Sequence, residues 1–238
     1  MFFKVTSSIV IAGALVGWCA APATAHFVWI ESEADGGDLL VRSGFGEPEG
    51  WDPDLIGRMQ AARFRLHTSA GWQPWEMKLD ATEREYRASI PTTRASAAGA
   101  ICDFGVIQFG GNPPSWLRYT AKSLLGPPSA WPQQADAEFR IELLAKRAGE
   151  NVQLTALHLG KPLAGAKIKC FSPKEQRLEL TTDENGSAAW PLAGPGRYAC
   201  YVGTTVAEKG DHGGKSYEAL KDYTTLTFII GDGAATKP

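Results

Sequence analysis

The feature that most constrains the fold is a repeated pattern of short alternating apolar and polar runs, each followed by turn residues. Alternation with a period of two is typical of strands with one face buried, and glycine, proline and asparagine between the runs favour turns. The pattern therefore predicts an all-β fold of the sandwich type. The runs lie at residues 62–67, 75–79, 86–90, 101–107, 116–119, 139–143, 152–157, 167–171, 198–202 and 224–230.

Two linked β-sandwich domains account for the length of the chain. Residues 126–134 are rich in proline and glycine and break any regular element, so we place a boundary there. The predicted domains cover residues 26–134 and 135–232, with a flexible tail at 233–238. The run at 224–230 is expected to close the second sheet. One short helix is predicted in the first domain, because Asp52 can cap it and Pro53 suits its first position.

The N-terminal stretch resembles a secretory signal peptide over residues 1–25. Lys4 precedes an apolar run too short to span a membrane, and Ala23 and Ala25 supply the small residues that a signal peptidase needs. The protein is thus expected in the periplasm or outside the cell, with no membrane span after cleavage. Cleavage after Ala25 makes His26 the first residue, and cleavage after Ala23 satisfies the same rule.

A histidine at the first position offers a metal ion two nitrogens, the α-amine and the imidazole. With a second histidine it forms a histidine brace, the nitrogen-rich arrangement that copper(II) prefers. His212 is the candidate partner, because it lies in a polar, glycine-rich loop where Asp211 can also contribute an oxygen. His67 and His158 fall within strand patterns and are interpreted as packed or hydrogen-bonded histidines. The alternative for His26 and His212 is a frayed terminus and a solvated loop.

Three cysteines follow the signal. Cys170 and Cys200 lie at the centres of predicted strands in the second domain, so a disulfide between them is the favoured pairing in an oxidising compartment. Cys102 is then left over. We interpret it as a buried apolar thiol, and its alternative role is that of a soft ligand to copper.

Composition and motifs exclude several classes of function. The formal net charge is −2 and no basic block occurs, so nucleic acid is not an expected partner. The motifs of α/β-hydrolases, zinc metalloproteases, P-loop enzymes and dithiol oxidoreductases are missing from the sequence. The chain is therefore predicted not to be an enzyme, with an N-terminal-histidine copper oxidase or monooxygenase as the lesser alternative.

Several segments resemble known families. The turns at 160–166 (GKPLAGA), 182–186 (TDENG) and 194–198 (GPGRY) resemble the transthyretin-like, or carboxypeptidase-regulatory-like, β-sandwich module. The start HFVW at 26–29, CDFGV at 102–106, YTAK at 119–122 and GKSY at 214–217 resemble an exported bacterial family of unknown function, labelled a nickel-uptake substrate-specific region. That resemblance implies an association with nickel and cobalt transport, and hence a membrane metal transporter as a partner.

Two functions remain open from the sequence. The first is an exported protein that binds copper, nickel or cobalt for uptake, delivery or sensing, through His26 and His212 with Asp211 or Cys102 nearby. The second is a non-enzymatic β-sandwich interaction module that binds glycan or protein at the cell envelope. Exposed tryptophan rings would serve the second function, and the candidates are Trp51, Trp72, Trp75 and Trp131.

Overall fold

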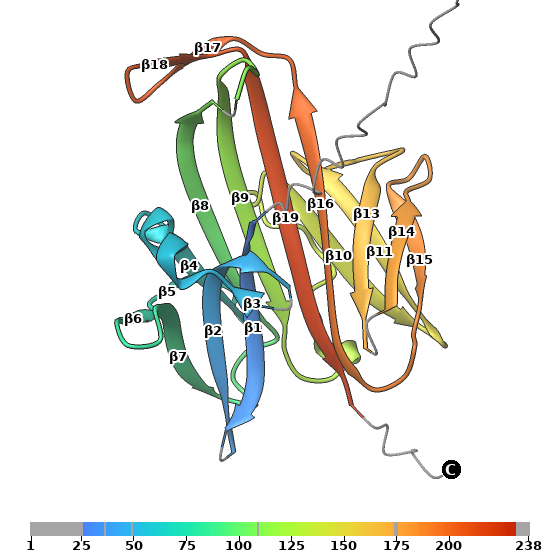
Figure 1. The fold of residues 1–238 in the computed structure, drawn as a ribbon. Helices are drawn as coiled ribbons and strands as arrows, with labels where there is room; N and C mark the ends of the chain where they lie inside the picture. The colour runs from blue at the N-terminus through green and yellow to red at the C-terminus, as the bar shows by residue number, and fades with distance from the viewer. Residues whose placement is uncertain (1–25, 36, 49, 109, 174–175, 232–238) are drawn as a thin grey trace, which may run out of the picture.

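A computed structural model of the chain describes residues 26–35, 37–48, 50–108, 110–173 and 176–231. The predicted signal peptide and the C-terminal tail lie outside the described residues. Within them the fold consists of stacked β-sheets and a small hairpin (Figure 1). The predicted all-β sandwich class is confirmed. No helix in this part of the chain is long and apolar enough to cross a membrane.

The central sheet, sheet B, contains strands from both halves of the sequence. The strand order is β14 (Gln176–Thr181), β13 (Lys167–Ser172), β16 (Gly196–Val206), β19 (Ala219–Ile230), β9 (Ser115–Leu124), β8 (Ala97–Ile107), β4 (Arg63–Thr68) and β5 (Gly71–Trp75). The pairing of β19 with β9 is parallel, whereas the neighbouring pairs are antiparallel. The run at 224–230, expected to close a sheet, therefore lies in the middle of one. The boundary near residue 134 stays a prediction, but sheet B runs across it without interruption.

Smaller sheets cover the two faces of sheet B. Sheet A has the order β1 (Phe27–Asp35), β2 (Asp38–Glu47), β7 (Glu85–Pro91) and β6 (Lys78–Asp80), with β3 (Gly50–Trp51) paired to the end of β2. In sheet C, β11 (Asn151–His158) pairs with β10 (Ile141–Ala148), β12 (Lys161–Pro162) and β15 (Ser187–Pro191). The hairpin consists of β17 (Gly210–His212) and β18 (Lys215–Tyr217) and stands at the top of sheet B in Figure 1.

Alternation along β9 shows that the two faces of sheet B contribute to two separate hydrophobic cores. Leu117, Tyr119 and Ala121 belong to a buried cluster with residues of sheet A, whereas Leu124 belongs to a second cluster with residues of sheet C. Successive side chains of a strand point to opposite faces. Even-numbered residues of β9 therefore face sheet C, and odd-numbered residues face sheet A.

The start of the predicted mature chain is firmly held. Residues 27–31 of β1 are all buried although β1 is an edge strand of sheet A. The hydroxyls of Thr225 and Thr227 on β19 donate to the carbonyls of Val28 and Ile30, at 2.7 and 2.5 Å. These bonds satisfy backbone groups that an edge strand would otherwise leave unpaired.

The short helix begins where the sequence predicts. Residues Pro53–Met59 form a 3₁₀-helix, η1, and the Asp52 carboxylate accepts a hydrogen bond from the Asp54 amide at 3.0 Å. A second 3₁₀ turn, η2, covers Pro128–Ala130 within the segment expected to break regular structure.

Candidate functional site

His212 lies on a hairpin and not in the irregular loop that the sequence suggested. It pairs with Lys215 across Gly213 and Gly214, whose φ angles of 57° and 75° are both positive. Two consecutive residues of this kind make the two-residue turn that suits the twist of a hairpin, and glycine adopts it without strain. The turn fixes His212 at the last pair of the ribbon.

A stack of rings holds the hairpin against sheet B. The His212 imidazole lies parallel to the Trp116 indole, with centroids 4.0 Å apart and planes 16° apart. Asp103 joins both rings: its carboxylate lies 3.0 Å from His212 Nε2 and accepts the Trp116 Nε1 hydrogen bond at 2.8 Å. The Arg118 guanidinium lies 4.4 Å from the Trp116 ring centroid. One imidazole nitrogen of His212, Nε2, and one face of its ring thus make contacts within the protein.

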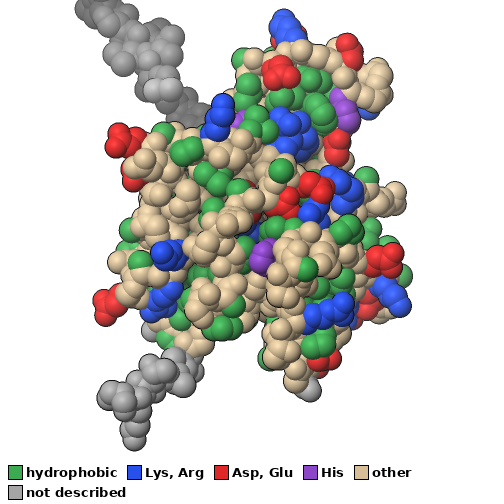
Figure 2. Space-filling view, turned by 180° about the vertical axis from the view of Figure 1, so that it is seen from behind, with side chains coloured by type: hydrophobic (Ala, Val, Ile, Leu, Met, Phe, Trp, Pro, Cys, Tyr) green, Lys and Arg blue, Asp and Glu red, His purple; other side chains and the backbone are tan. Residues whose placement is uncertain are grey.

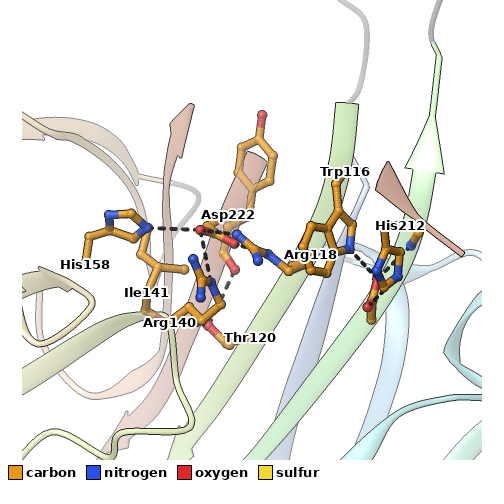
Figure 3. Close-up of polar contacts among 11 residues, drawn as sticks. Trp116, Arg118, Thr120, Arg140, Ile141, His158, His212 and Asp222 are labelled. Atoms are coloured by element: carbon orange, nitrogen blue, oxygen red, sulfur yellow. Dashed lines mark hydrogen bonds and ion pairs between the residues drawn. The ribbon is translucent and has the colours of Figure 1, made fainter. Parts of the chain in front are cut away.

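The stack continues into a buried ion-pair network (Figure 3). Asp222, whose side chain is 2% exposed, accepts two hydrogen bonds from Arg118 at 2.6 and 2.9 Å. His158 Nε2 lies 3.0 Å and Arg140 Nε lies 3.7 Å from the same carboxylate. Figure 2 shows acidic and basic side chains gathered between histidines on this side of the molecule. Because His158 belongs to sheet C, the network ties the hairpin to that sheet.

His26 lies on the other side of sheet B from His212. Its ring stacks on Phe45 at 6.0 Å, and its carbonyl accepts a hydrogen bond from the Tyr119 hydroxyl. Tyr119 faces sheet A, whereas Trp116, whose ring stacks on that of His212, faces sheet C. A metal ion needs its nitrogen ligands within about 2 Å of itself. The structure therefore does not bring His26 and His212 together.

The remaining predicted ligands are also dispersed. Cys102 is 1% exposed, and burial raises the pKa of its thiol to about 12, which disfavours the thiolate that a metal binds. Asp211 accepts a hydrogen bond from Ser216 at 2.6 Å. Among the described residues, no group of three or more histidine, cysteine, aspartate and glutamate side chains is placed to hold a metal ion. Binding of copper, nickel or cobalt stays a prediction of the sequence.

Cys170 and Cys200 lie directly opposite each other in the register of β13 and β16. Both thiols are buried and free in the structure. Burial and the neighbouring Cys170 thiol raise the pKa of Cys200 well above its ordinary value. The disulfide stays a prediction, and the register gives it the adjacent positions that it needs.

A cleft on the outer face of sheet A is a site that the sequence did not single out. It encloses about 310 Å³ and its lining includes Glu31, Arg42, Trp51, Arg84, Glu85 and Arg197. We call it the Trp51 cleft. Ligand sites in proteins usually measure about 300–1,000 Å³. The described lining combines one aromatic ring with glutamates and arginines in equal number.

Glycines on β2 position the aromatic ring. A Cβ atom on Gly44 would lie 2.3–2.8 Å from the Cε3, Cδ2 and Cγ atoms of Trp51. The indole therefore lies flat on the Gly44 backbone, with its other face directed away from the strand. Gly46 pairs with Trp51 in the β2–β3 ladder, and this short ladder holds the ring from its backbone side. The result is an aromatic platform fixed to a rigid sheet.

Charged pairs surround the platform. Glu31, 6% exposed, lies 2.5 Å from Arg197 Nη1 and 3.9 Å from Arg42 Nη2. Arg42 Nη1 lies 4.0 Å from Glu85, which also pairs with Arg87. Burial raises the pKa of Glu31, and the charges of Arg197 and Arg42 oppose that shift. Carboxylate acceptors and guanidinium donors thus alternate across the cleft.

Sequence reasoning identified Trp51 as a candidate but missed the charged residues around it. Glu31 faces Arg42 across β1 and β2, and Arg42 faces Arg87 across β2 and β7. The strand register that creates these pairs is not visible in the sequence. Of the other tryptophans expected to be exposed, Trp72 and Trp75 are half-buried, whereas Trp131 is buried in the core beside Phe228.

Comparisons with known proteins give no family. The chain matches no protein-family model and no curated protein. Similar solved structures include a 1.5-MDa bacterial ice-binding adhesin, 10% identical over 84% of this chain and 64% of the other, with a TM-score of 0.21. A Ca²⁺-stabilised adhesin of an Antarctic bacterium is 13% identical over 85% of this chain and 49% of the other, with a TM-score of 0.24. Both matches span less than two thirds of the other chain. Likeness at this level does not indicate a shared function.

Proposed function

We propose that the protein is an exported, non-enzymatic β-sandwich module that binds glycan at the cell envelope through the Trp51 cleft. The observation that carries the proposal is the cleft itself, in which a fixed indole is surrounded by paired acidic and basic side chains. A rigid sheet presents these groups, so binding requires little reordering of the protein.

The charges of the cleft favour a neutral ligand with many hydroxyl groups. The described lining holds as many arginines as glutamates, and Glu31 already forms ion pairs with Arg42 and Arg197. An ionic ligand would have to break such a pair. A hydroxyl group both donates and accepts hydrogen bonds, so it can contact a guanidinium and a carboxylate at once. Neighbouring hydroxyls on a sugar ring match this alternation.

The Trp51 ring supports the same conclusion. Its face away from Gly44 lines the cleft, and the residue remains half-exposed. The Arg42 guanidinium lies 5.6 Å from the ring centroid, within the range of a cation–π contact. A fixed aromatic face offers apolar contact to the C–H groups of a sugar ring. The hydroxyl groups at the rim of the sugar can then form hydrogen bonds with the charged pairs around the indole.

A glycan array and a matched peptide array test the proposal with the mature protein beginning at His26. We expect the wild type to retain neutral glycans and the Trp51→Ala variant to lose them. Trp75→Ala is the matched control, because Trp75 is also a half-buried tryptophan but lines a different cleft. Equal retention by all three proteins, or retention of peptides alone, would show that the Trp51 cleft is not a glycan site.

A further inference from the structure

We propose that the glycan site continues beyond the Trp51 cleft, over Arg197, into a second cleft at Phe171, so that the ligand is a linear oligosaccharide chain. This inference rests on the proposed function. It adds that the site spans several sugar units and that Arg197 joins its two parts.

The second cleft adjoins the first. It encloses about 270 Å³, and its lining includes Phe171, Pro173 and Ala199. Pro48 and Arg197 line this Phe171 cleft and the Trp51 cleft alike. Because the two hollows share these walls, a ligand long enough to leave one enters the other.

The position of the Phe171 cleft follows from the width of sheet A. Its outermost strand, β1, lies over β19 and β9, as the bonds from Thr225 and Thr227 show. The strands β16 and β13 lie beyond that edge in sheet B. Phe171, which is half-buried, and its buried pairing partner Ala199 belong to these two strands, while the Trp51 cleft lies on sheet A. A bound chain would therefore run from the outer face of sheet A onto the neighbouring strip of sheet B.

Arg197 is fixed at the junction by both ends of its guanidinium. Nη1 lies 2.5 Å from Glu31, and Nη2 donates to the Pro48 carbonyl at 2.9 Å. Its side chain nevertheless remains 44% exposed. An arginine held in this way has a defined plane and keeps donor capacity toward solvent, because its guanidinium carries five N–H groups. It can bind the hydroxyls of a sugar unit that lies between the clefts.

The second cleft repeats the chemistry of the first. Phe171 stacks on Tyr201, with centroids 6.1 Å apart, which fixes its ring on sheet B. The Arg177 guanidinium lies 5.5 Å from the Phe171 ring centroid and lines the same cleft. An aromatic ring beside a guanidinium thus occurs on either side of Arg197, as expected for successive sugar units of one chain.

Isothermal titration calorimetry with three length series tests the inference. The probes are glucose oligomers linked α-1,4, glucose oligomers linked β-1,4 and N-acetylglucosamine oligomers, each from the monosaccharide to the hexamer. In one series or more, we expect the affinity to rise at least about tenfold from the monomer to the hexamer, because the second cleft adds contacts to a ligand that is already bound.

Two variants show which cleft provides the increase in affinity with ligand length. Phe171→Leu keeps an apolar side chain but removes the aromatic plane, so it should reduce the gain with length and leave the monosaccharide affinity unchanged. Trp51→Ala should abolish binding of every length. A flat length series, or equal weakening of monomer and hexamer by Phe171→Leu, overturns the two-cleft inference while the proposed function stands. No binding in any of the length series, together with no retention on the glycan array, overturns both the two-cleft inference and the proposed function.

Discussion

Substitution of Gly44 by alanine should displace the Trp51 ring, and a double-mutant cycle can measure the contact. The added methyl group would lie 2.3 Å from Cε3 and 2.4 Å from Cδ2 of Trp51, whereas carbon atoms pack at about 3.5–4.0 Å. Such overpacking costs about 1–3 kcal/mol. The backbone of Gly44 is not in the left-handed region, so alanine itself is tolerated and should regain about 0.5–1 kcal/mol relative to glycine.

The expected effect of Gly44→Ala on stability therefore differs between the two backgrounds. Gly44→Ala should destabilise the wild type, but it should be neutral or stabilising in the Trp51→Ala background, where the clashing ring is absent. The two backgrounds should differ by about 2 kcal/mol, well above the few tenths expected of independent sites. Urea unfolding measures each variant as a shift of the midpoint at constant m-value.

Gly46→Ala is the matched control. Its methyl group would meet backbone atoms, namely Trp51 Cα at 2.6 Å and Asp52 N at 2.8 Å, so loss of the indole cannot relieve the clash. Gly46→Ala should thus be equally costly in both backgrounds. An equal cost of Gly44→Ala in both backgrounds would refute the contact between the Trp51 ring and the Gly44 backbone.

Three further predictions concern groups away from this contact. Lys122 and Glu142 form a buried ion pair at 2.5 Å, so Lys122→Met should cost about 3–5 kcal/mol in urea unfolding by leaving Glu142 unpaired. Lys122→Met with Glu142→Gln should recover most of that loss, and no recovery would contradict the assignment. Burial raises the pKa of Glu31 above its usual 4.5, so the stability that Glu31 contributes is present below pH 4.5 and is lost as the pH rises through the raised value. The stability of the wild type relative to Glu31→Gln should accordingly fall as the pH rises above 4.5, and a difference independent of pH would contradict this. Copper(II) electron paramagnetic resonance on protein beginning at His26 should show no joint coordination by His26 and His212, and a stoichiometric nitrogen-rich signal lost in His212→Ala would contradict the separation by sheet B.

Local patterns in the sequence were sufficient for the class of fold and for several individual elements. Alternation predicted strands such as those at 152–157 and 167–171, and Asp52 with Pro53 predicted the start of the short helix. These signals depend on neighbours along the chain, so a single sequence contains them. The sequence placed His212 in a polar, glycine-rich loop, but the role of Gly213 and Gly214 as a hairpin turn depends on the pairing of His212 with Lys215.

The arrangement of the sheets depends on long-range pairing, which local patterns do not specify. The parallel pairing of β19 with β9 joins residues about a hundred positions apart and places the last strand at the centre of sheet B. It also separates His26 from His212, because sheet B then lies between them. The Trp51 cleft likewise needs the register of β1, β2 and β7 and the reach of Arg197 from another sheet.

The most direct test of the central claim is to observe which indole responds when a glycan binds. In ¹⁵N-labelled protein each tryptophan gives its own indole N–H signal, and the Trp51→Phe variant identifies that of Trp51. On titration with a glycan retained on the array, our account predicts that the Trp51 signal shifts and saturates, while the signal of Trp190, which is buried in the core on the side of sheet C, stays in place. Saturating binding that shifts the Trp75 or Trp116 signal and leaves Trp51 unchanged would contradict it.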